Sequence, residues 1–290
     1  MTIEQALDAA RQAGLDRLDA QLLLLQALGL GSDRRAWLIA HDTDSLGNET
    51  QTRFLAMVAR RKDNEPLAYI TGTKEFYGLT LKVDANVLVP RPETETLVDW
   101  ALEQLLPTPC GRVLDLGTGS GAVALAIKHT RPDLEVHALD TSEPALTVAQ
   151  GNAHSLGLDI RFHVSHWLTR APTGLFDVIA SNPPYVAAGD DHLGALRHEP
   201  LSALVAAEHG LSDLRAIIAS APAHLAKGGW LLLEHGYDQA SLVRNLLMTA
   251  GFAQVQTRKD LAGLARCSGG QWLPVGEIID PTVRPNGRFH

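Results

Sequence analysis

The most informative stretch of this sequence is Val113-Leu-Asp-Leu-Gly-Thr-Gly-Ser-Gly121, an apolar segment followed by alternating glycines. It reads as a buried strand that ends in a loop and opens a helix. Glycines allow a tight turn and let backbone amides approach a ligand closely. Nineteen residues beyond Gly121, Asp140 ends the next predicted strand, where its carboxylate can accept hydrogen bonds from a ribose diol. The pattern predicts a nucleoside site formed by Gly117, Thr118, Gly119, Ser120, Gly121 and Asp140.

The segments around this loop alternate between apolar runs and helical patterns. Strands are expected at 112–116, 135–139, 160–164, 176–180 and 231–233, and helices at 121–129, 143–156 and 211–225. Strands separated by helices form a mostly parallel sheet with helices on both faces. We therefore predict an α/β fold with a Rossmann-like sheet over residues 91–268. Residues 269–290 contain three prolines and are expected to form a surface tail.

The amino-terminal part of the chain has a different pattern. Residues 1–70 read as helical, with a capping box at Thr2 and Gln5, leucines at helical spacing and a second helix start near Asn48. Around Gly78 apolar residues alternate as in a β-hairpin, which predicts a hairpin linker at 71–90 and a hinge between two domains. We expect the small helical domain to recognise the substrate.

The composition limits the kinds of protein this chain can be. Its 290 residues include 25 Lys and Arg against 33 Asp and Glu, a formal net charge of −8. At roughly 150 residues per domain this length suggests two domains. The acidic balance argues against wrapping long nucleic acid, so no direct nucleic-acid binding is expected. Two distant cysteines, no visible signal peptide and no apolar run long enough for a bilayer favour a cytoplasmic protein without a membrane segment.

A second chemical signal is Asn182-Pro-Pro-Tyr185, directly after the predicted strand 176–180. Two prolines fix the backbone and lack N–H donors, which leaves carbonyl oxygens exposed as acceptors. The Asn182 side chain adds an amide carbonyl, and Tyr185 adds an aromatic face. Two convergent acceptors beside an aromatic ring suit a planar –NH2 group, because they hold both of its hydrogens and leave its nitrogen free.

The glycine loop alone does not choose the nucleoside. Gly117-x-Gly119-x-x-Ala122 also fits the dinucleotide fingerprint, so NAD remains open. His163 and His166 could suggest a metal site. Three residues apart on a strand, they face opposite sides and no third ligand is apparent, so no metal is expected.

A resemblance to a known family narrows the choice. The loop from Asp115 to Gly121, followed by Asn182-Pro-Pro-Tyr185, resembles class I S-adenosylmethionine-dependent methyltransferases that act on amino groups, including adenine-specific DNA methyltransferases. Three further stretches resemble the PrmC (HemK) family: Pro90-Arg-Pro-Glu-Thr-Glu95, Glu199-Pro-Leu-Ser-Ala203 and Leu233-Glu-His-Gly236. With the helical amino-terminal domain, the resemblance runs from about residue 5 to Arg266.

This resemblance implies an activity and a role for each site residue. Members of the family use S-adenosylmethionine to methylate the glutamine of the Gly-Gly-Gln motif in bacterial peptide-chain release factors. Residues 117–121 would hold the methionine part of the cofactor, Asp140 its ribose, and Trp167 would lie next to adenine. Asn182 would touch cofactor and substrate, and the rest of the glutamine pocket would be Pro183, Pro184 and Tyr185. Catalysis would rest on positioning, with Asn182 and Pro183 accepting the amide hydrogens and Tyr185 packed on the flat side chain.

Two features depart from the family's pattern. An acidic residue usually precedes the tryptophan, whereas this chain has His166, whose neutral imidazole can still accept a hydrogen bond from adenine. The chain also continues beyond Arg266 and contains its own Gly269-Gly-Gln271. We interpret this tripeptide as a coincidence. The alternative hypothesis is that the tail enters the active site of its own chain.

Three other functions remain open. An adenine-specific DNA methyltransferase would use the same pocket but needs a basic target-recognition domain, which the net charge of −8 does not support. A nicotinamide oxidoreductase would explain the glycine loop and Asp140, but Asn182-Pro-Pro-Tyr185 would have no function in it. A non-catalytic module that binds release factors or ribosomes would leave both motifs unused.

Overall fold

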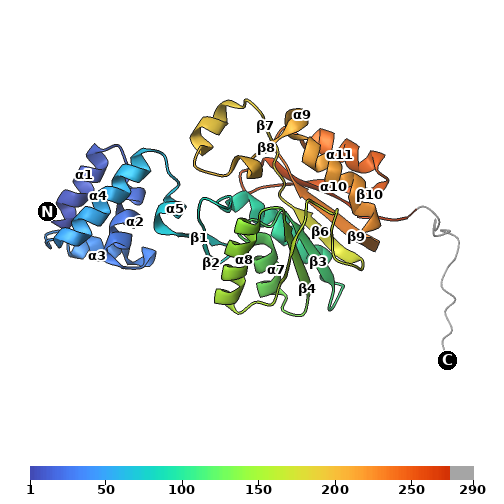
Figure 1. Ribbon diagram of the computed structural model, residues 1–290, viewed down its shortest axis with the longest axis horizontal. Coiled ribbons are helices and arrows are strands. Elements are labelled where there is room, and N and C mark those ends of the chain that lie inside the picture. The colour runs from blue at the N-terminus through green and yellow to red at the C-terminus, as the bar shows by residue number, and fades with distance from the viewer. Residues whose placement is uncertain (275–290) are drawn as a thin grey trace.

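Two domains lie side by side along the long axis of the molecule (Figure 1). The computed structural model describes residues 1–274 of the chain. The smaller domain is helical, and the larger one surrounds a seven-stranded sheet. The helices of the smaller domain are α1 (Ile3–Gln12), α2 (Arg17–Leu28), the short 3-10 turn η1 (Ser32–Arg34), α3 (Arg35–Ala40), α4 (Asn48–Lys62) and α5 (Leu67–Thr71).

The helical domain has an apolar core of its own. Helix α1 begins with the predicted capping box, in which the Thr2 side chain accepts a hydrogen bond from the Gln5 amide and the Gln5 side chain accepts one from the Thr2 amide. Helix α2 packs against α1, α3, α4 and α5, so most of its sides are covered. Leu18, near its start, is 47% exposed, because the neighbouring helices do not reach that part of α2. The predicted leucine stripe is therefore only partly correct.

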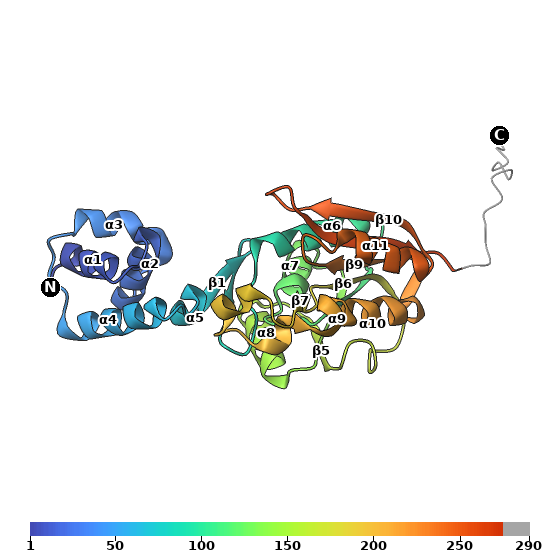
Figure 2. The same ribbon diagram turned by 90° about the horizontal axis from the view of Figure 1, so that it is seen from above.

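The β-hairpin β1 (Thr73–Phe76) and β2 (Leu79–Lys82) follows α5 and carries the chain into the larger domain (Figure 2). Its two-residue turn, Tyr77-Gly78, has φ of 52° and 73°, the left-handed values that such hairpins need. Three of its apolar side chains pack into the core of the larger domain: Phe76, Leu79 and Leu81. The predicted hairpin is confirmed, but its strands are part of the larger domain's core. The predicted hairpin linker at 71–90 thus joins the two domains and also packs as part of the larger one.

The sheet of the larger domain has the strand order β10-β11-β9-β6-β3-β4-β5. Five strands are parallel, namely β3 (Arg112–Leu116), β4 (Glu135–Asp140), β5 (Arg161–Val164), β6 (Phe176–Ser181) and β9 (Leu225–Glu234). Two antiparallel strands complete one edge, β10 (Phe252–Lys259) and β11 (Ala265–Trp272). This is the predicted Rossmann-like α/β sheet.

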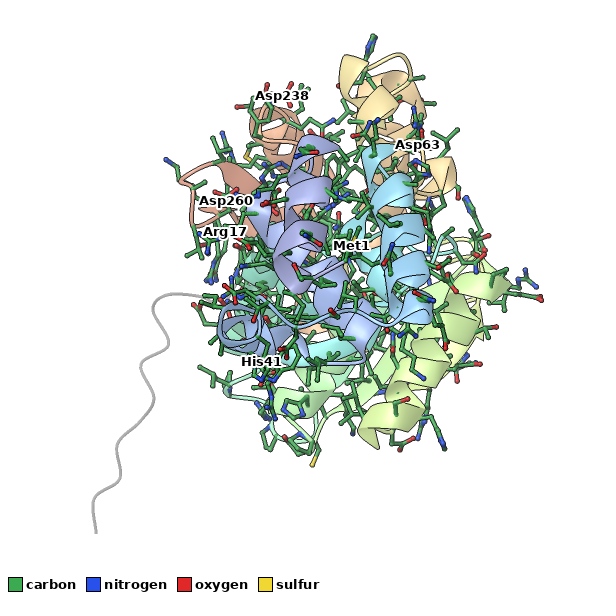
Figure 3. All side chains as sticks on the ribbon, turned by 90° about the vertical axis from the view of Figure 1, so that its left-hand side faces the viewer. Met1, Arg17, His41, Asp63, Asp238 and Asp260 are labelled. Atoms are coloured by element: carbon green, nitrogen blue, oxygen red, sulfur yellow. The ribbon has the colours of Figure 1, made fainter. Side chains whose placement is uncertain are left out.

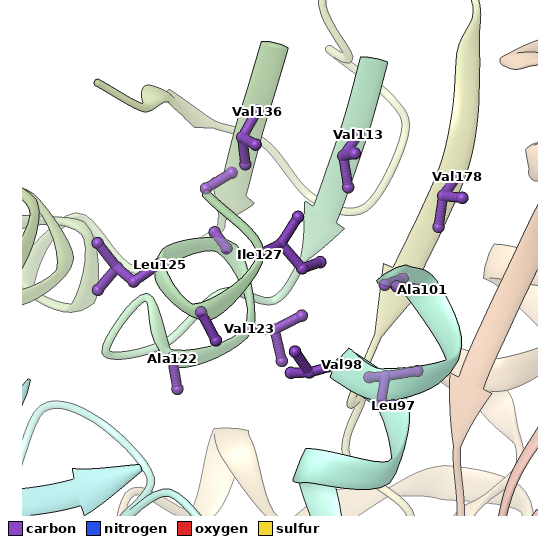
Figure 4. Packing of buried hydrophobic residues seen from close by; sticks show 14 of the residues in the cluster. Leu97, Val98, Ala101, Val113, Ala122, Val123, Leu125, Ile127, Val136 and Val178 are labelled. Carbon is purple, nitrogen blue, oxygen red and sulfur yellow. The ribbon is translucent and has the colours of Figure 1, made fainter. Parts of the chain in front are cut away.

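Helices cover both faces of the sheet. One face carries the apolar cluster of α6 (Glu95–Gln104), α7 (Ala122–Thr130) and α8 (Glu143–Leu156), and the other carries α10 (Ser212–Ser220) and α11 (Ala240–Thr249). Figure 4 shows apolar side chains of α6 and α7 on the first face, together with a valine from each of three neighbouring strands: Val113, Val136 and Val178. The remaining short elements are η2 (Pro92–Thr94), β7 (Val186–Ala187), η3 (Asp191–Leu196), η4 (Leu201–Ala203), β8 (Val205–Ala206), α9 (Ala207–Gly210) and η5 (Ala221–Ala223).

Within residues 1–274, none of the helices has both the length and the apolar character of a membrane span.

The expected surface tail begins too early, because Gly269, Gly270 and Gln271 are paired with β9 inside strand β11. Glycine is required there, since a Cβ on Gly269 would come within 2.6 Å of the Leu231 carbonyl oxygen. In a sequence, glycines that let a neighbouring backbone approach closely look the same as glycines that interrupt a strand. The Gln271 amide donates to the carbonyl oxygen of Gly228 at 2.9 Å. The hypothesis of a tail in its own active site is thus wrong for Gln271, while 275–290 lie outside the described residues.

Candidate active site

A cavity of about 520 Å³ opens where the carboxyl ends of β3, β4, β5 and β6 meet. This edge is where open parallel α/β sheets bind ligands. Eight of the residues that the sequence analysis named line the cavity: Gly117, Thr118, Gly119, Ser120, Asp140, Trp167, Asn182 and Pro184. Three others do not line it directly: Gly121, Pro183 and Tyr185.

The glycine loop takes a conformation that side chains would resist. Gly117, Gly119 and Gly121 have φ of 70°, 55° and 86°, in the left-handed region. A Cβ on Gly117 would lie 3.2 Å from the Trp167 ring, so the loop and the indole are packed against each other. The loop therefore presents backbone, rather than side chains, to a ligand in the cavity.

Asp140 is held at the cavity wall by backbone donors. Its Oδ2 accepts from the Gly119 amide and its Oδ1 from the Ser142 amide, both at 2.9 Å. Each carboxylate oxygen has a further lone pair, so the group can still accept from a ligand. These contacts fix the carboxylate beside the glycine loop, where a ligand diol would meet it.

Asp115 is a site residue that the sequence analysis quoted but did not assign. Its carboxylate is buried and accepts from the Thr118 hydroxyl at 2.6 Å and from the Ala124 amide at 3.2 Å. Burial raises the pKa of Asp115 to about 7, although both hydrogen bonds favour the ionised form. Ala124 lies in the first turn of α7, so this carboxyl group occupies a helix amide that a bound phosphate would otherwise use. The position of Asp115 at the start of the glycine motif is the sequence signal that could have identified it as a site residue.

Trp167 has a fixed orientation. Its backbone φ is 45°, and its indole Nε1 donates to Oδ1 of Asp213 on α10 at 2.9 Å. Asp213 also lines the cavity, and no sequence signal pointed to it. His166 is exposed at the cavity wall beside the tryptophan.

The segment after β6 meets the cavity through Asn182 and Pro184. The Asn182 Nδ2 atom donates to the Thr94 hydroxyl at 3.2 Å. Tyr185 turns away from the cavity, and its hydroxyl donates to Oε1 of Glu234 at 3.4 Å. Burial, together with the charge of Glu234, holds the pKa of the Tyr185 phenol well above its ordinary value. Thr94 and Glu234 lie in two of the stretches that resemble the PrmC (HemK) family. The sequence alone predicted no role for either side chain.

A loop that follows β7 connects this region to the helical domain. Glu199 is buried and accepts from the Arg91 guanidinium and from the Val89 amide, which anchors the loop beside the cavity. Two residues earlier, Arg197 binds Asp63 at the end of α4, and the His198 ring contacts the Asp63 carbonyl oxygen at 2.9 Å. Figure 3 shows Asp63 at the side of the helical domain that meets this loop.

The charges of the cavity wall suit a cationic ligand. Among the lining residues that the structure describes, three are aspartates: Asp115, Asp140 and Asp213. The arginine in the same wall, Arg91, is already paired with Glu199. A diphosphate would meet carboxylates here and find the first turn of α7 already occupied by Asp115. The electrostatics therefore disfavour a dinucleotide.

Comparisons with known proteins identify the family of this chain. A family model described as the methyltransferase small domain matches residues 97–260, and one described as the PrmC N-terminal domain matches residues 2–72. A release factor glutamine methyltransferase from Burkholderia pseudomallei is 48% identical to this chain, over 92% of the chain and 95% of that protein. This chain belongs to the release factor glutamine methyltransferase family. A member of this family from Escherichia coli is 40% identical, over 93% of the chain and 97% of that protein.

A solved methyltransferase structure from Pyrococcus furiosus shares the fold, with a TM-score of 0.51 and 21% identity over 73% of this chain and 95% of that one. The predicted family is confirmed, and the protein is a methyltransferase. The nicotinamide oxidoreductase and the non-catalytic module are set aside. The relatives carry the name of an enzyme that acts on a glutamine.

Proposed function

We propose that this enzyme transfers a methyl group from S-adenosylmethionine to the side-chain amide nitrogen of the glutamine in the Gly-Gly-Gln motif of bacterial peptide-chain release factors. One observation carries the proposal. Asn182 and Pro184 of the segment after β6 line the same cavity as the glycine loop, in a chain of the release factor glutamine methyltransferase family. An amide acceptor site and a nucleoside site thus share one wall.

The residues around the cavity fit S-adenosylmethionine as the methyl donor. When bound, it supplies a methyl group that is already activated by a positive sulfonium. Residues 117–120 would hold its methionine part, Asp140 its ribose and Trp167 its adenine. The three aspartates of the wall favour a cation, which distinguishes this donor from a dinucleotide.

The chain's own contribution to catalysis is positioning. An amide nitrogen is a weak nucleophile because its lone pair is delocalised into the carbonyl. Acceptors from Asn182 and Pro183 would bind the two amide hydrogens and favour a pyramidal nitrogen as charge develops. Pro184 and Tyr185 complete the pocket in this proposal. Tyr185 would have to turn, or to act through its ring edge, since its hydroxyl points toward Glu234.

The helical domain is proposed to grip the release factor away from the methylated loop. This arrangement makes the release factor a protein partner, and no direct contact with nucleic acid is needed. We expect the reaction to take place in the cytoplasm, where release factors act.

A methyl-transfer assay with labelled S-adenosylmethionine tests the proposal. Intact bacterial release factor and unmethylated duplex DNA are offered side by side. We expect label on the release factor alone, and its loss when the glutamine of the Gly-Gly-Gln motif is replaced. Label that persists after this replacement, or that goes to DNA, would contradict the proposed substrate.

A further inference from the structure

Gln239 is a buried glutamine directly before α11, and no step of the proposed reaction uses it. The residue is 7% exposed. The turn from Gly236 to Gln239 is closed twice: the Gln239 backbone amide donates to the Gly236 carbonyl oxygen, and the Gly236 amide donates to Oε1 of Gln239, both at 2.9 Å. Because a backbone N–H can only donate, this second contact fixes which end of the side-chain amide is the oxygen. The Nε2 end must therefore point away from Gly236.

The Nε2 end of Gln239 meets the segment that carries the proposed amide acceptors. It donates to the carbonyl oxygen of Tyr185 at 3.1 Å and, at a longer 3.4 Å, to the carbonyl oxygen of His209. A side-chain amide nitrogen has two hydrogens, so these two carbonyl groups use both. Gln239 thus joins the turn before α11 to the end of the Asn182-Pro-Pro-Tyr185 segment and to α9.

The backbone of α9 is shaped to admit this contact. Glu208, His209 and Gly210 have φ of 53°, 56° and 84°, three successive residues in the left-handed region. Two of them carry side chains, which makes this conformation unfavourable unless the surrounding structure holds it. A Cβ on Gly210 would collide with the carbonyl oxygen of Tyr185. The left-handed turn and the glycine therefore leave the space in which Gln239 reaches both carbonyl groups.

The two prolines of the segment make it depend on contacts from outside. The chain leaves the sheet after Ser181, the last residue of β6, and reaches β7 at Val186. Between them, Pro183 and Pro184 have no N–H and cannot hold the backbone by donating a hydrogen bond. Tyr185 follows the prolines directly. A partner that fixes its carbonyl group therefore limits how far the rigid Pro-Pro pair can move away from the cavity.

We propose that Gln239 is a positioning residue for methyl transfer: it holds the carbonyl group of Tyr185 and so keeps Asn182 and the two prolines at the cavity wall. The inference rests on the proposed function, since it requires this segment to bind the glutamine amide. Gln239 is not among the described residues that line the cavity, so it acts through Tyr185. An amide suits this position, because Gly236 needs an acceptor and Tyr185 needs a donor.

The substitution Gln239→Leu tests the role of the amide. Leucine fills a similar space without a donor or an acceptor, and we expect kcat on intact release factor to fall about tenfold, the scale of one buried hydrogen bond. The KM for release factor and the calorimetric Kd for S-adenosylmethionine should stay unchanged, which also shows that the variant is folded.

The matched control is Gln271→Leu. Gln271 is also a glutamine that donates to a backbone carbonyl group, that of Gly228 at 2.9 Å. Gly228 lies near the start of β9, whereas Glu234 at its other end contacts Tyr185. This control loses the same kind of hydrogen bond in the same domain, and it should keep the wild-type kcat.

The pH dependence of Gln239→Glu is a second test, which separates the donor from the shape. A protonated carboxyl group can accept from Gly236 and donate to Tyr185, as the amide does, whereas a carboxylate has only acceptors. Burial raises the pKa of a carboxyl group at such a position. Between about pH 5 and about pH 9, we expect the ratio of variant kcat to wild-type kcat to fall as the pH rises.

The ratio of the two kcat values isolates position 239 because the neighbouring ionisable groups are the same in both proteins. The segments that Gln239 contacts carry six of them: Tyr185, Glu208, His209, Glu234, His235 and Asp238. A ratio that is low and equal at every pH would overturn the inference, because the loss would then come from a change of shape.

The outcomes separate this inference from the proposed function. Wild-type kcat in Gln239→Leu overturns the role of Gln239 and leaves the proposed substrate untouched. A raised KM for release factor at unchanged kcat overturns it as well, since Gln239 would then act in binding. A wild-type enzyme without activity on any release factor, yet with normal S-adenosylmethionine binding, contradicts the proposed function itself.

Discussion

The two domains of this enzyme have separate apolar cores but very different buried polar groups. In residues 1–71 the buried polar side chains are Asp19 and Gln21, and Asp19 is paired with Arg61. Among the described residues of the sheet domain, four carboxyl groups are buried, and the first of them lines the cavity: Asp115, Glu199, Glu234 and Asp260. The helical domain can therefore act only through its surface, while the sheet domain holds the chemistry. Binding of the protein substrate and turnover should be separable by mutation.

The contacts between the two domains fit this division. The chain crosses at α5 and Gly72, and Asp63 of α4 meets Arg197 and His198 of the loop near the cavity. The contacts of Asp63 are exposed ion pairs, which contribute little stability, whereas Ala68 and Tyr69 of α5 belong to a small buried apolar cluster shared with the sheet domain. Away from this shared cluster, each domain should respond to mutation on its own.

The largest effect is expected from Asn182→Ala in the sheet domain. Loss of a transition-state acceptor should lower kcat by about two orders of magnitude or more. Single-turnover kinetics with saturating release factor measure this, and Asn245→Ala on the exposed side of α11 is the matched control. A decrease in affinity for the release factor at unchanged kcat would contradict the proposed division between a helical domain that binds the substrate and a sheet domain that carries out the reaction. It would place substrate recognition in the sheet domain.

Deletion of the helical domain tests the other half of the comparison. The hairpin and α5 have to be retained, because the hairpin strands are part of the sheet domain's core and α5 packs against it, so only residues 1–66 are removed. We expect kcat/KM on intact release factor to fall at least about tenfold, since remote binding energy is lost. The Kd for S-adenosylmethionine should not change. Equal rates of the truncated and the full-length enzyme would show that the helical domain does not recognise the substrate.

A smaller effect, confined to cofactor binding, is expected from Asp140→Ala. The substitution removes the proposed ribose acceptor, one bond that holds the glycine loop at Gly119 and one bond from the Ser142 amide at the start of α8. Calorimetry should show a Kd for S-adenosylmethionine that is about tenfold weaker, with a lesser change in kcat. Asp159→Ala, at an exposed loop position, serves as the control. An unaltered Kd in Asp140→Ala would contradict the ribose assignment.

The smallest predicted effect concerns acid stability, and it belongs to the sheet domain. His137 on β4 is buried, and burial lowers its pKa below the ordinary value of 6.5, although Glu135 raises it. The unfolded chain therefore binds a proton more readily than the folded one. The stability that the neutral His137 contributes is present above pH 6.5 and is lost as the pH falls below it.

Urea unfolding at about pH 7.5 and about pH 5.5 measures this difference. The wild type should lose stability at the lower pH, and His137→Gln should lose less of its own. An equal loss in both proteins would assign the acid sensitivity to other groups.

Much of the fold could be predicted from the sequence because its patterns are local. The strand before the glycine loop, the hairpin turn at Tyr77-Gly78 and the capping box at Thr2 each carry their signal within a few residues. Helix α11 and strands β10 and β11 were missed. Strand β11 contains two adjacent glycines, a residue type that is depleted in strands, so its sequence does not indicate a strand. Packing against distant strands, rather than local preference, determines their conformation.

The candidate site was predicted to a similar extent. Residues of the two motifs line the cavity, because strand ends in a parallel sheet meet at one edge. The partners that orient them were not predictable. Thr94 and Asp213 reach the site from helical segments far away in sequence, and only the tertiary structure brings them there.

Strand β11 places Gly269-Gly-Gln271 inside a folded sheet. It carries the tripeptide that the enzyme is proposed to methylate, but folding pairs both glycines with β9 and holds half-buried Gln271 between β9 and β10. Only a chain that has not yet folded, such as one still emerging from the ribosome, could offer this glutamine to a finished enzyme molecule. A methyl group on Gln271 in purified protein would therefore date the modification to the time before the chain folded.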